Sequence, residues 1–194
     1  MNWAPPTPED STTMWKEINN NKHDRVVAIV CNSYIDTLLE GCLRQRLSDS
    51  VHSKMFGHRG ILQSQAAKID LAQGIGLLSS DAAEDLIYLN RIRNRFAHYI
   101  KVDTFEHPDI KKLCASLKLM PALFEQVARI NTDPVEIKNL RSMHARTPPR
   151  IQFTNTAGSI ANYLAQVWRR GPMPIQDPSH IKYWSDTWQP PPAA

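Results

Sequence analysis

The chain has 194 residues, of which 42% are hydrophobic; this supplies one core, and the length is too short for two full-size domains. Its 23 Lys and Arg outnumber 19 Asp and Glu, and the formal net charge of +4 mildly favours anionic partners without the basic runs of a dedicated DNA-binding protein. We find no stretch approaching the roughly 20 apolar residues of a membrane span and no export signal at the N-terminus, so we expect a cytoplasmic protein that does not enter a membrane.

The first residues are expected to form an arm, residues 1–22, that packs on the body of the protein. Prolines at positions 5, 6 and 8 keep the chain extended. Ser11 or Thr12 is then placed to cap a short helix that carries Met14, Trp15 and Ile18.

The main domain, residues 23–170, begins with a long helix from Asp24. Its apolar residues recur at spacings of three and four, which places them on one broad helical face: Val27, Val30, Tyr34, Leu38 and Cys42. The segment from Ser48 to Gly60 is polar and bounded by glycines, and we predict that it is a mobile loop.

Two further helices follow this loop. Leu62, Ala66, Ile69, Leu71 and Ile75 define the first, which Gly74 and Gly76 can end in the left-handed conformation. Ser80 or Asp81 is predicted to cap the second, with Glu84 completing a capping box.

The C-terminal third predicts more helices and then a tail. His107 and Pro108 begin one helix, Pro121 and Asp133 begin two more, and the Pro148-Pro149 break precedes an amphipathic helix that ends at Gly171. The tail, residues 171–194, is rich in proline and tryptophan and is expected to wrap the body or a partner. No alternating strand pattern appears, so the predicted class is all-α, an antiparallel helical bundle with additional C-terminal helices.

Three cysteines and seven histidines offer little for a metal or a disulfide. Cys31, Cys42 and Cys114 form no C-x-x-C pair and are expected to be reduced core residues. The histidines contain no H-x-x-x-H, and His52 with His58 is a weak pair. We therefore expect neither a metal nor a cofactor.

The run from Arg93 to His98 is the strongest candidate for a functional site. At about 100° per residue, Asn94 and His98 share a helical stripe, whereas Arg93 lies about 140° from His98. One helix therefore cannot aim Arg93 and His98 at the same atom without distortion. A second copy of the protein, related by a two-fold axis, could supply the complementary group.

These side chains suit cleavage of a phosphodiester. His98 would act as a general base or acid, Arg93 would hold the phosphate, and Asn94 would orient His98 or bind the phosphate. We expect Arg91, Arg95 and Tyr99 to contact phosphate or RNA nearby.

A structural alternative stands beside this interpretation. Arg91, Arg93 and Arg95 would pair with carboxylates such as Asp70, Glu84 and Asp85, and His98 would only favour the helix dipole.

Four short blocks of the chain resemble the mannitol operon repressor family. They are Gly60-Ile61-Leu62, Lys68 to Ala72, Gly76-Leu77-Leu78, and Asp85-Leu86 with Arg91 to His98, within residues 24–115. The R-N-x-x-x-H core is also similar to that of HEPN domains, helical bundles that often pair so that two such motifs meet. Toxin-type HEPN motifs place a tyrosine two residues after the histidine, where this chain has Ile100.

The two resemblances imply different functions. The repressor resemblance implies a transcriptional regulator that acts through a protein or RNA rather than a DNA-reading helix, in agreement with the lack of a helix-turn-helix flanked by basic residues. The HEPN resemblance implies a homodimeric, metal-independent endoribonuclease that uses Arg93, Asn94 and His98. A third hypothesis makes the Pro- and Trp-rich tail a ligand for a partner.

Overall fold

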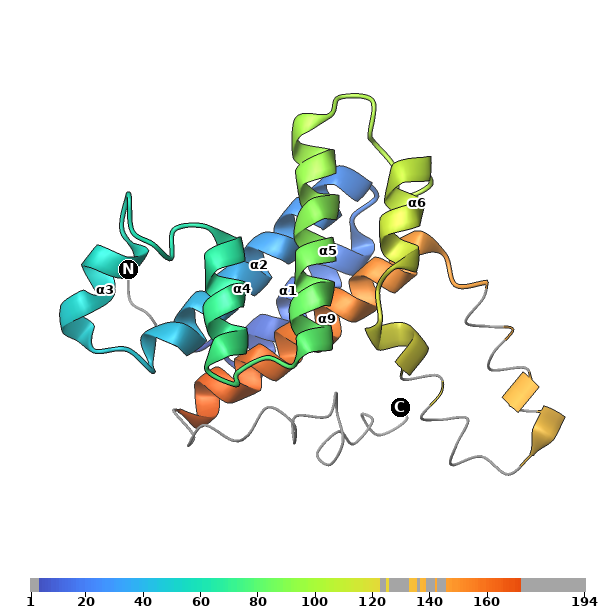
Figure 1. Cartoon of the computed structure of the whole chain (residues 1–194). Helices are drawn as coiled ribbons and strands as arrows, with labels where there is room; N and C mark the ends of the chain where they lie inside the picture. The colour runs from blue at the N-terminus through green and yellow to red at the C-terminus, as the bar shows by residue number, and fades with distance from the viewer. Residues whose placement is uncertain are drawn as a thin grey trace.

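The computed structural model describes residues 4–122 and 146–171, together with positions 125, 133–135, 137, 138 and 142. All regular structure in this part of the chain is helical, which confirms the all-α class. The helices, labelled as in Figure 1, are α1 (Pro8–Asn20), α2 (Asp24–Arg44), α3 (Asp49–Phe56), α4 (Gln65–Gly74), α5 (Ser80–His98), α6 (Pro108–Ala115) and α9 (Pro149–Arg170).

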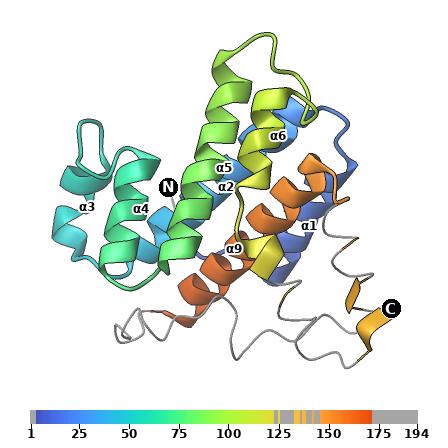
Figure 2. The same ribbon diagram turned by 45° about the vertical axis from the view of Figure 1, so that its right-hand side comes forward.

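Helix α2 is the centre of the fold and contacts α9, α5, α4 and α1. Consecutive helices α4, α5 and α6 alternate in direction, as the predicted antiparallel bundle requires (Figures 1 and 2). In contrast, α2 and α9 run parallel, since Arg150 binds Asp24 at their first turns and Gln45 binds the Trp168 carbonyl at their ends. Gly41 allows α2 and α9 to approach each other closely, because a Cβ atom at this position would lie only 2.5 Å from the Trp168 ring.

The core between these helices is apolar and contains all three thiols. Phe105 packs between Phe96 and Phe153, with ring centroids 5.0 and 5.1 Å apart. Cys31, Cys42 and Cys114 are buried and free, as predicted, and burial raises the pKa of each thiol to about 12. Such thiols stay protonated and unreactive at neutral pH.

One buried cation lies in the seam between α2 and α4. Lys68 is 3% exposed, and its Nζ lies 2.9 Å from Asp36 and 2.7 Å from Glu40. Glu40 also binds Arg44 at 2.8 Å. The negative charges of these two carboxylates therefore balance the positive charge of the buried lysine.

Two helix starts differ from the prediction. The N-cap of α1 is Thr7, which forms a capping box with Asp10, rather than Ser11 or Thr12. The N-cap of α5 is Ser79, whose side chain accepts from the Ala82 amide, one residue before the predicted position. In both cases a neighbouring Ser or Thr competes for the cap, and sequence alone does not rank them.

The prediction of a loop between Ser48 and Gly60 was wrong, because this segment contains α3. This helix has no fully buried residue, and its apolar residues, Val51, Met55 and Phe56, are too few for the periodic pattern that sequence analysis uses. Local contacts hold it instead: His52 bonds to the Arg44 and Leu47 carbonyls, and the Arg44 guanidinium lies 4.4 Å from the centroid of the Phe56 ring.

The predicted boundaries of α6 and α9 were confirmed, whereas α4 starts only at Gln65, so Leu62 lies before it and Ile75 is its C-cap. Helix α6 starts after His107, α9 starts at Pro149 and ends at Gly171, and Gly76 is left-handed with φ of 71°. Most of the predicted helices after Pro121 and Asp133, and the tail after Gly171, lie outside the described residues.

The expectation that no apolar stretch matches a membrane span was wrong for α2. By length and composition this helix is apolar enough to cross a bilayer, although 56% of its most apolar window is buried inside the protein. Its position between α9, α5 and α4 accounts for that composition, since a helix covered on several sides carries a wide apolar face.

Candidate functional site

The predicted site residues occupy the last two turns of α5 and its C-cap, Tyr99, at the top of Figure 1 next to the start of α2. A helix end leaves its last carbonyls without intrahelical partners. Arg25 of α2 satisfies one of them here, donating to the Phe96 carbonyl at 2.6 Å. It also donates to two carbonyls of the turn that follows, Ile100 at 3.1 Å and Val102 at 2.9 Å, with a longer bond to Tyr99. The turn that follows His98 is therefore fixed from a second helix.

Arg93 lies on the inner side of α5, where its side chain is half-buried. Its Nη1 donates to the Asn94 Oδ1 at 2.9 Å. The Nε is buried and has no hydrogen-bond partner among the described residues. The N–H group at this nitrogen is therefore a buried hydrogen-bond donor without an acceptor.

His98 lies on the outer side of the same helix and is exposed. Within the described part of the chain, no hydrogen bond or ion pair holds its imidazole. One copy of the protein therefore joins Arg93 to Asn94 and leaves His98 apart, in keeping with the angular separation that the sequence predicts. A site that contains both Arg93 and His98 would therefore need a second copy of the protein.

Arg91 and Arg95 each lie over a tyrosine ring on the exposed face of α5. The Arg91 guanidinium is 5.6 Å from the centroid of Tyr88, and that of Arg95 is 4.8 Å from the centroid of Tyr99. These are cation–π distances, and they order two long side chains at the surface. Tyr88 was absent from the predicted site, although its spacing of three from Arg91 could have indicated the contact.

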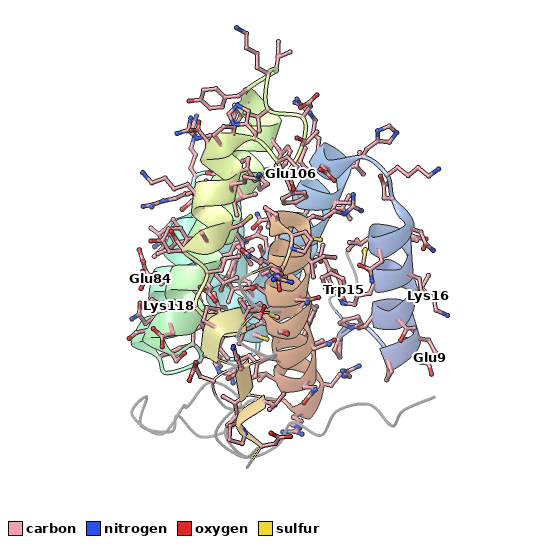
Figure 3. The ribbon with its side chains drawn as sticks, turned by 90° about the vertical axis from the view of Figure 1, so that its right-hand side faces the viewer. Glu9, Trp15, Lys16, Glu84, Glu106 and Lys118 are labelled. Carbon is pink, nitrogen blue, oxygen red and sulfur yellow. The ribbon has the colours of Figure 1, made fainter. Side chains whose placement is uncertain are left out.

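The structural alternative assigned the wrong carboxylates to the arginines of α5. Arg95 lies 3.9 Å from Asp109 of α6, not from a carboxylate earlier in α5. Glu84 pairs instead with Lys118 at 2.6 Å, and the two lie side by side in Figure 3. Asp85 is fully buried and accepts from the amides of Lys118 and Leu119 at 2.7 and 2.9 Å.

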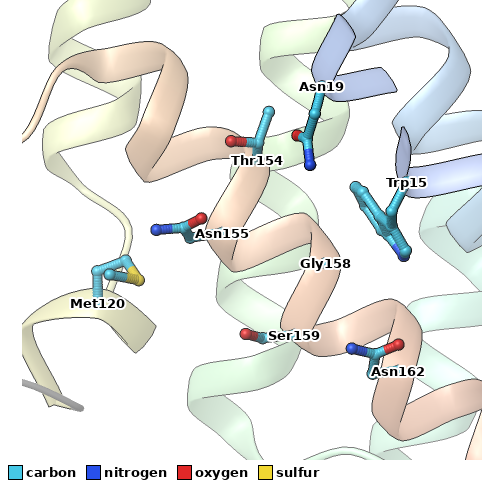
Figure 4. A pocket seen from close by; sticks show the side chains of 8 residues that line it. All are labelled: Trp15, Asn19, Met120, Thr154, Asn155, Gly158, Ser159 and Asn162. Carbon is cyan, nitrogen blue, oxygen red and sulfur yellow. The ribbon is translucent and has the colours of Figure 1, made fainter. Parts of the chain in front are cut away.

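A different kind of hollow lies between α1 and α9 (Figure 4). It has a volume of about 320 Å³ and is lined by neutral side chains: Trp15, Asn19, Met120, Thr154, Asn155, Gly158, Ser159 and Asn162. None of these lining groups titrates near neutral pH, so they offer no general acid or base to activate the hydroxyls of Thr154 and Ser159.

Ligands for a metal do not converge in the described part of the chain, where no three His, Cys, Asp or Glu side chains come together. The chemistry available at the end of α5 is therefore that of guanidinium, amide and imidazole groups. Such groups bind anions and transfer protons.

Comparison with known proteins gives one structural relationship. No protein-family model and no curated protein matches the sequence. A chain in the X-ray structure of the MtlR-HPr complex from Escherichia coli has a similar fold, with a TM-score of 0.59, and the match covers 80% of this chain and 98% of that chain. The sequence identity is 14%, so this similarity shows the fold alone.

Proposed function

We propose that this chain is a regulatory protein of the MtlR type that acts by binding another protein. The observation that carries the proposal is the fold shared with a chain from the MtlR-HPr complex, because MtlR is a mannitol operon regulator. The resemblance of residues 24–115 to the mannitol operon repressor family supports it. We place the protein in the cytoplasm, where its three thiols would stay reduced.

Two measurements test this proposal. Isothermal titration calorimetry of the full chain with HPr from the same organism is expected to show saturable binding. Deletion of the gene is expected to change the transcript level of a sugar-uptake operon, while the purified chain gives no sequence-specific shift of that operon's promoter DNA. Unchanged transcript levels together with no HPr binding would contradict the proposal.

A second candidate is a metal-independent endoribonuclease with its site at a homodimer interface. The unpartnered Nε of Arg93 and the exposed, uncommitted His98 favour it. In this scheme one His98 removes the proton from a ribose 2'-hydroxyl, and the 2'-oxygen attacks phosphorus. Arg93 holds the phosphate oxygens with Asn94, and the histidine of the other copy protonates the departing 5'-oxygen, which leaves a cyclic phosphate.

The ribonuclease candidate has its own test. The full chain is incubated with mixed RNA in EDTA beside His98→Ala, with His58→Ala as a control, since His58 is also exposed but lies before α4. Cleavage that His98→Ala loses and His58→Ala keeps would support catalysis. Equal cleavage by all three proteins, or none by any, would remove this candidate. Sedimentation of the unchanged chain as a monomer would also count against it.

A further inference from the structure

Four residues line one side of α5 and its C-cap, and we call them the α5 stripe: Tyr88, Arg91, Arg95 and Tyr99. Arg91 and Tyr99 are exposed, Arg95 is partly exposed, and Tyr88 is partly buried against the core. Their spacings of three and four place them on one side of the helix. Each arginine lies over a tyrosine, at 5.6 and 4.8 Å from the ring centroids. Tyrosine and arginine are the residue types enriched at the energetic centres of protein interfaces.

Ile100 continues the α5 stripe past the end of the helix. It is 91% exposed, and Tyr99 beside it is 52% exposed. An aliphatic side chain this exposed contributes no burial to the fold. Yet Arg25 binds its carbonyl and that of Val102, with a longer bond to Tyr99, so the backbone that presents it is fixed.

This arrangement lowers the cost of association. Ring stacking has already ordered Arg91 and Arg95, and the bonds from Arg25 have already ordered the turn that carries Ile100. A partner therefore immobilises fewer side chains and less backbone when it binds.

Charge narrows the choice of partner. Residues 88–112 hold six Lys or Arg and three Asp or Glu, and one of these carboxylates, Asp109, already faces Arg95. Another, Glu106, lies 2.6 Å from Lys111. A second copy that docked through the same stripe would bring like charges together. The exposed Ile100 favours an apolar pocket, which a protein provides and an RNA backbone does not.

We infer that the α5 stripe with Ile100 docks a protein partner through an acidic surface that surrounds an apolar pocket. This inference rests on the proposed regulatory function and assigns the binding surface for it.

Photocrosslinking on the full chain tests the assignment. Ile100 is replaced by p-benzoylphenylalanine, the protein is expressed in its own organism and irradiated, and crosslinked products are identified by mass spectrometry. The same replacement at Ile61, which is 73% exposed before α4, is the control. We expect a protein product at position 100 and not at position 61, with the crosslinked peptide next to Asp or Glu residues of the partner.

Charge reversal sharpens the test. The double change Arg91→Glu with Arg95→Glu is expected to reduce the product at position 100 at least tenfold, whereas Lys54→Glu on α3 is expected to leave it unchanged. Thermal unfolding of each variant verifies that the fold is intact. Loss of the product only in the α5 variant supports the inference.

The other outcomes overturn it in distinguishable ways. A product with RNA, or with a second copy of this chain, shows that the stripe has a different occupant. No product at position 100 from a chain that does bind its partner overturns the assignment and leaves the proposed function standing. If neither crosslinking nor calorimetry finds a protein partner, the result contradicts both the proposed function and the assigned surface.

Discussion

The two ends of α5 use their charges in opposite ways. At the N-terminal end, Asp85 binds two backbone amides in the core, and Asp81 and Glu84 both bind Lys118. At the C-terminal end, Arg91 and Arg95 rest on tyrosine rings at the surface, and His98 is exposed. The first end holds the chain that follows α6, and the second leaves charge available to another molecule.

The largest expected effect of a substitution is at the N-terminal end. Asp85→Ala leaves two buried amides without an acceptor, and we expect it to lower the free energy of unfolding by about 3 to 5 kcal/mol. Urea denaturation followed by circular dichroism measures this loss. Asp81→Asn, which changes an exposed carboxylate one turn earlier, is the control and should have a much smaller effect. Equal losses would mean that burial does not separate the two carboxylates.

A smaller loss is expected where the C-terminal end meets α2. Arg25→Ala removes the bonds to the carbonyls after Phe96 and should cost about 2 kcal/mol, because charged donors contribute more than neutral ones but this guanidinium is partly exposed. Hydrogen exchange should also become faster at residues 99–102 than in the middle of α5. Unchanged exchange there would show that the turn does not depend on Arg25.

Substitutions in the α5 stripe itself should hardly change stability. Ile100→Glu and Arg91→Glu alter exposed side chains, so we expect the free energy of unfolding to move by less than about 0.5 kcal/mol. Thermal unfolding in parallel with Asp85→Ala makes the comparison direct. A large destabilisation by Ile100→Glu would indicate that this residue serves the fold.

The smallest effect should come from Lys118→Met, and it should depend on pH. The hydrogen bonds that Lys118 donates to the carboxylates of Asp81 and Glu84 raise its pKa above the ordinary value of 10.5. A raised pKa stabilises the folded protein fully below the ordinary value, and the benefit is lost as pH rises through the folded one. The midpoint difference from the unchanged chain should therefore be small and constant from neutral to mildly alkaline pH, and should narrow above about pH 10.5. A difference that grew with pH would contradict this assignment.

The sequence predicted the helices whose signals are local and strong. The three-four spacing from Val27 to Cys42 predicted α2, and prolines predicted the starts of α6, at Pro108, and of α9, at Pro149. It did not predict α3, because that short helix has no fully buried residue and is held in part by contacts of Arg44 and His52 that the sequence does not reveal.

For the candidate site, helical geometry alone predicted the separation of Arg93 from His98. The role of Arg25 had no signal in the sequence, since its bonds reach carbonyls more than 70 positions away. The carboxylate partners of the arginines were misassigned for the same reason. Asp85 is used by the amides of Lys118 and Leu119, which only the folded chain brings to it.

The parallel pairing of α2 with α9 constrains how the chain reaches its native state. Asp24 meets Arg150 and Cys42 meets the Leu164 carbonyl, so these contacts close loops of more than 120 residues. Such distant contacts slow folding relative to bundles built from sequence neighbours. On the ribosome, the face of α2 that packs on α9 stays uncovered until α9 has been synthesised, so newly made chains should depend on chaperones during translation.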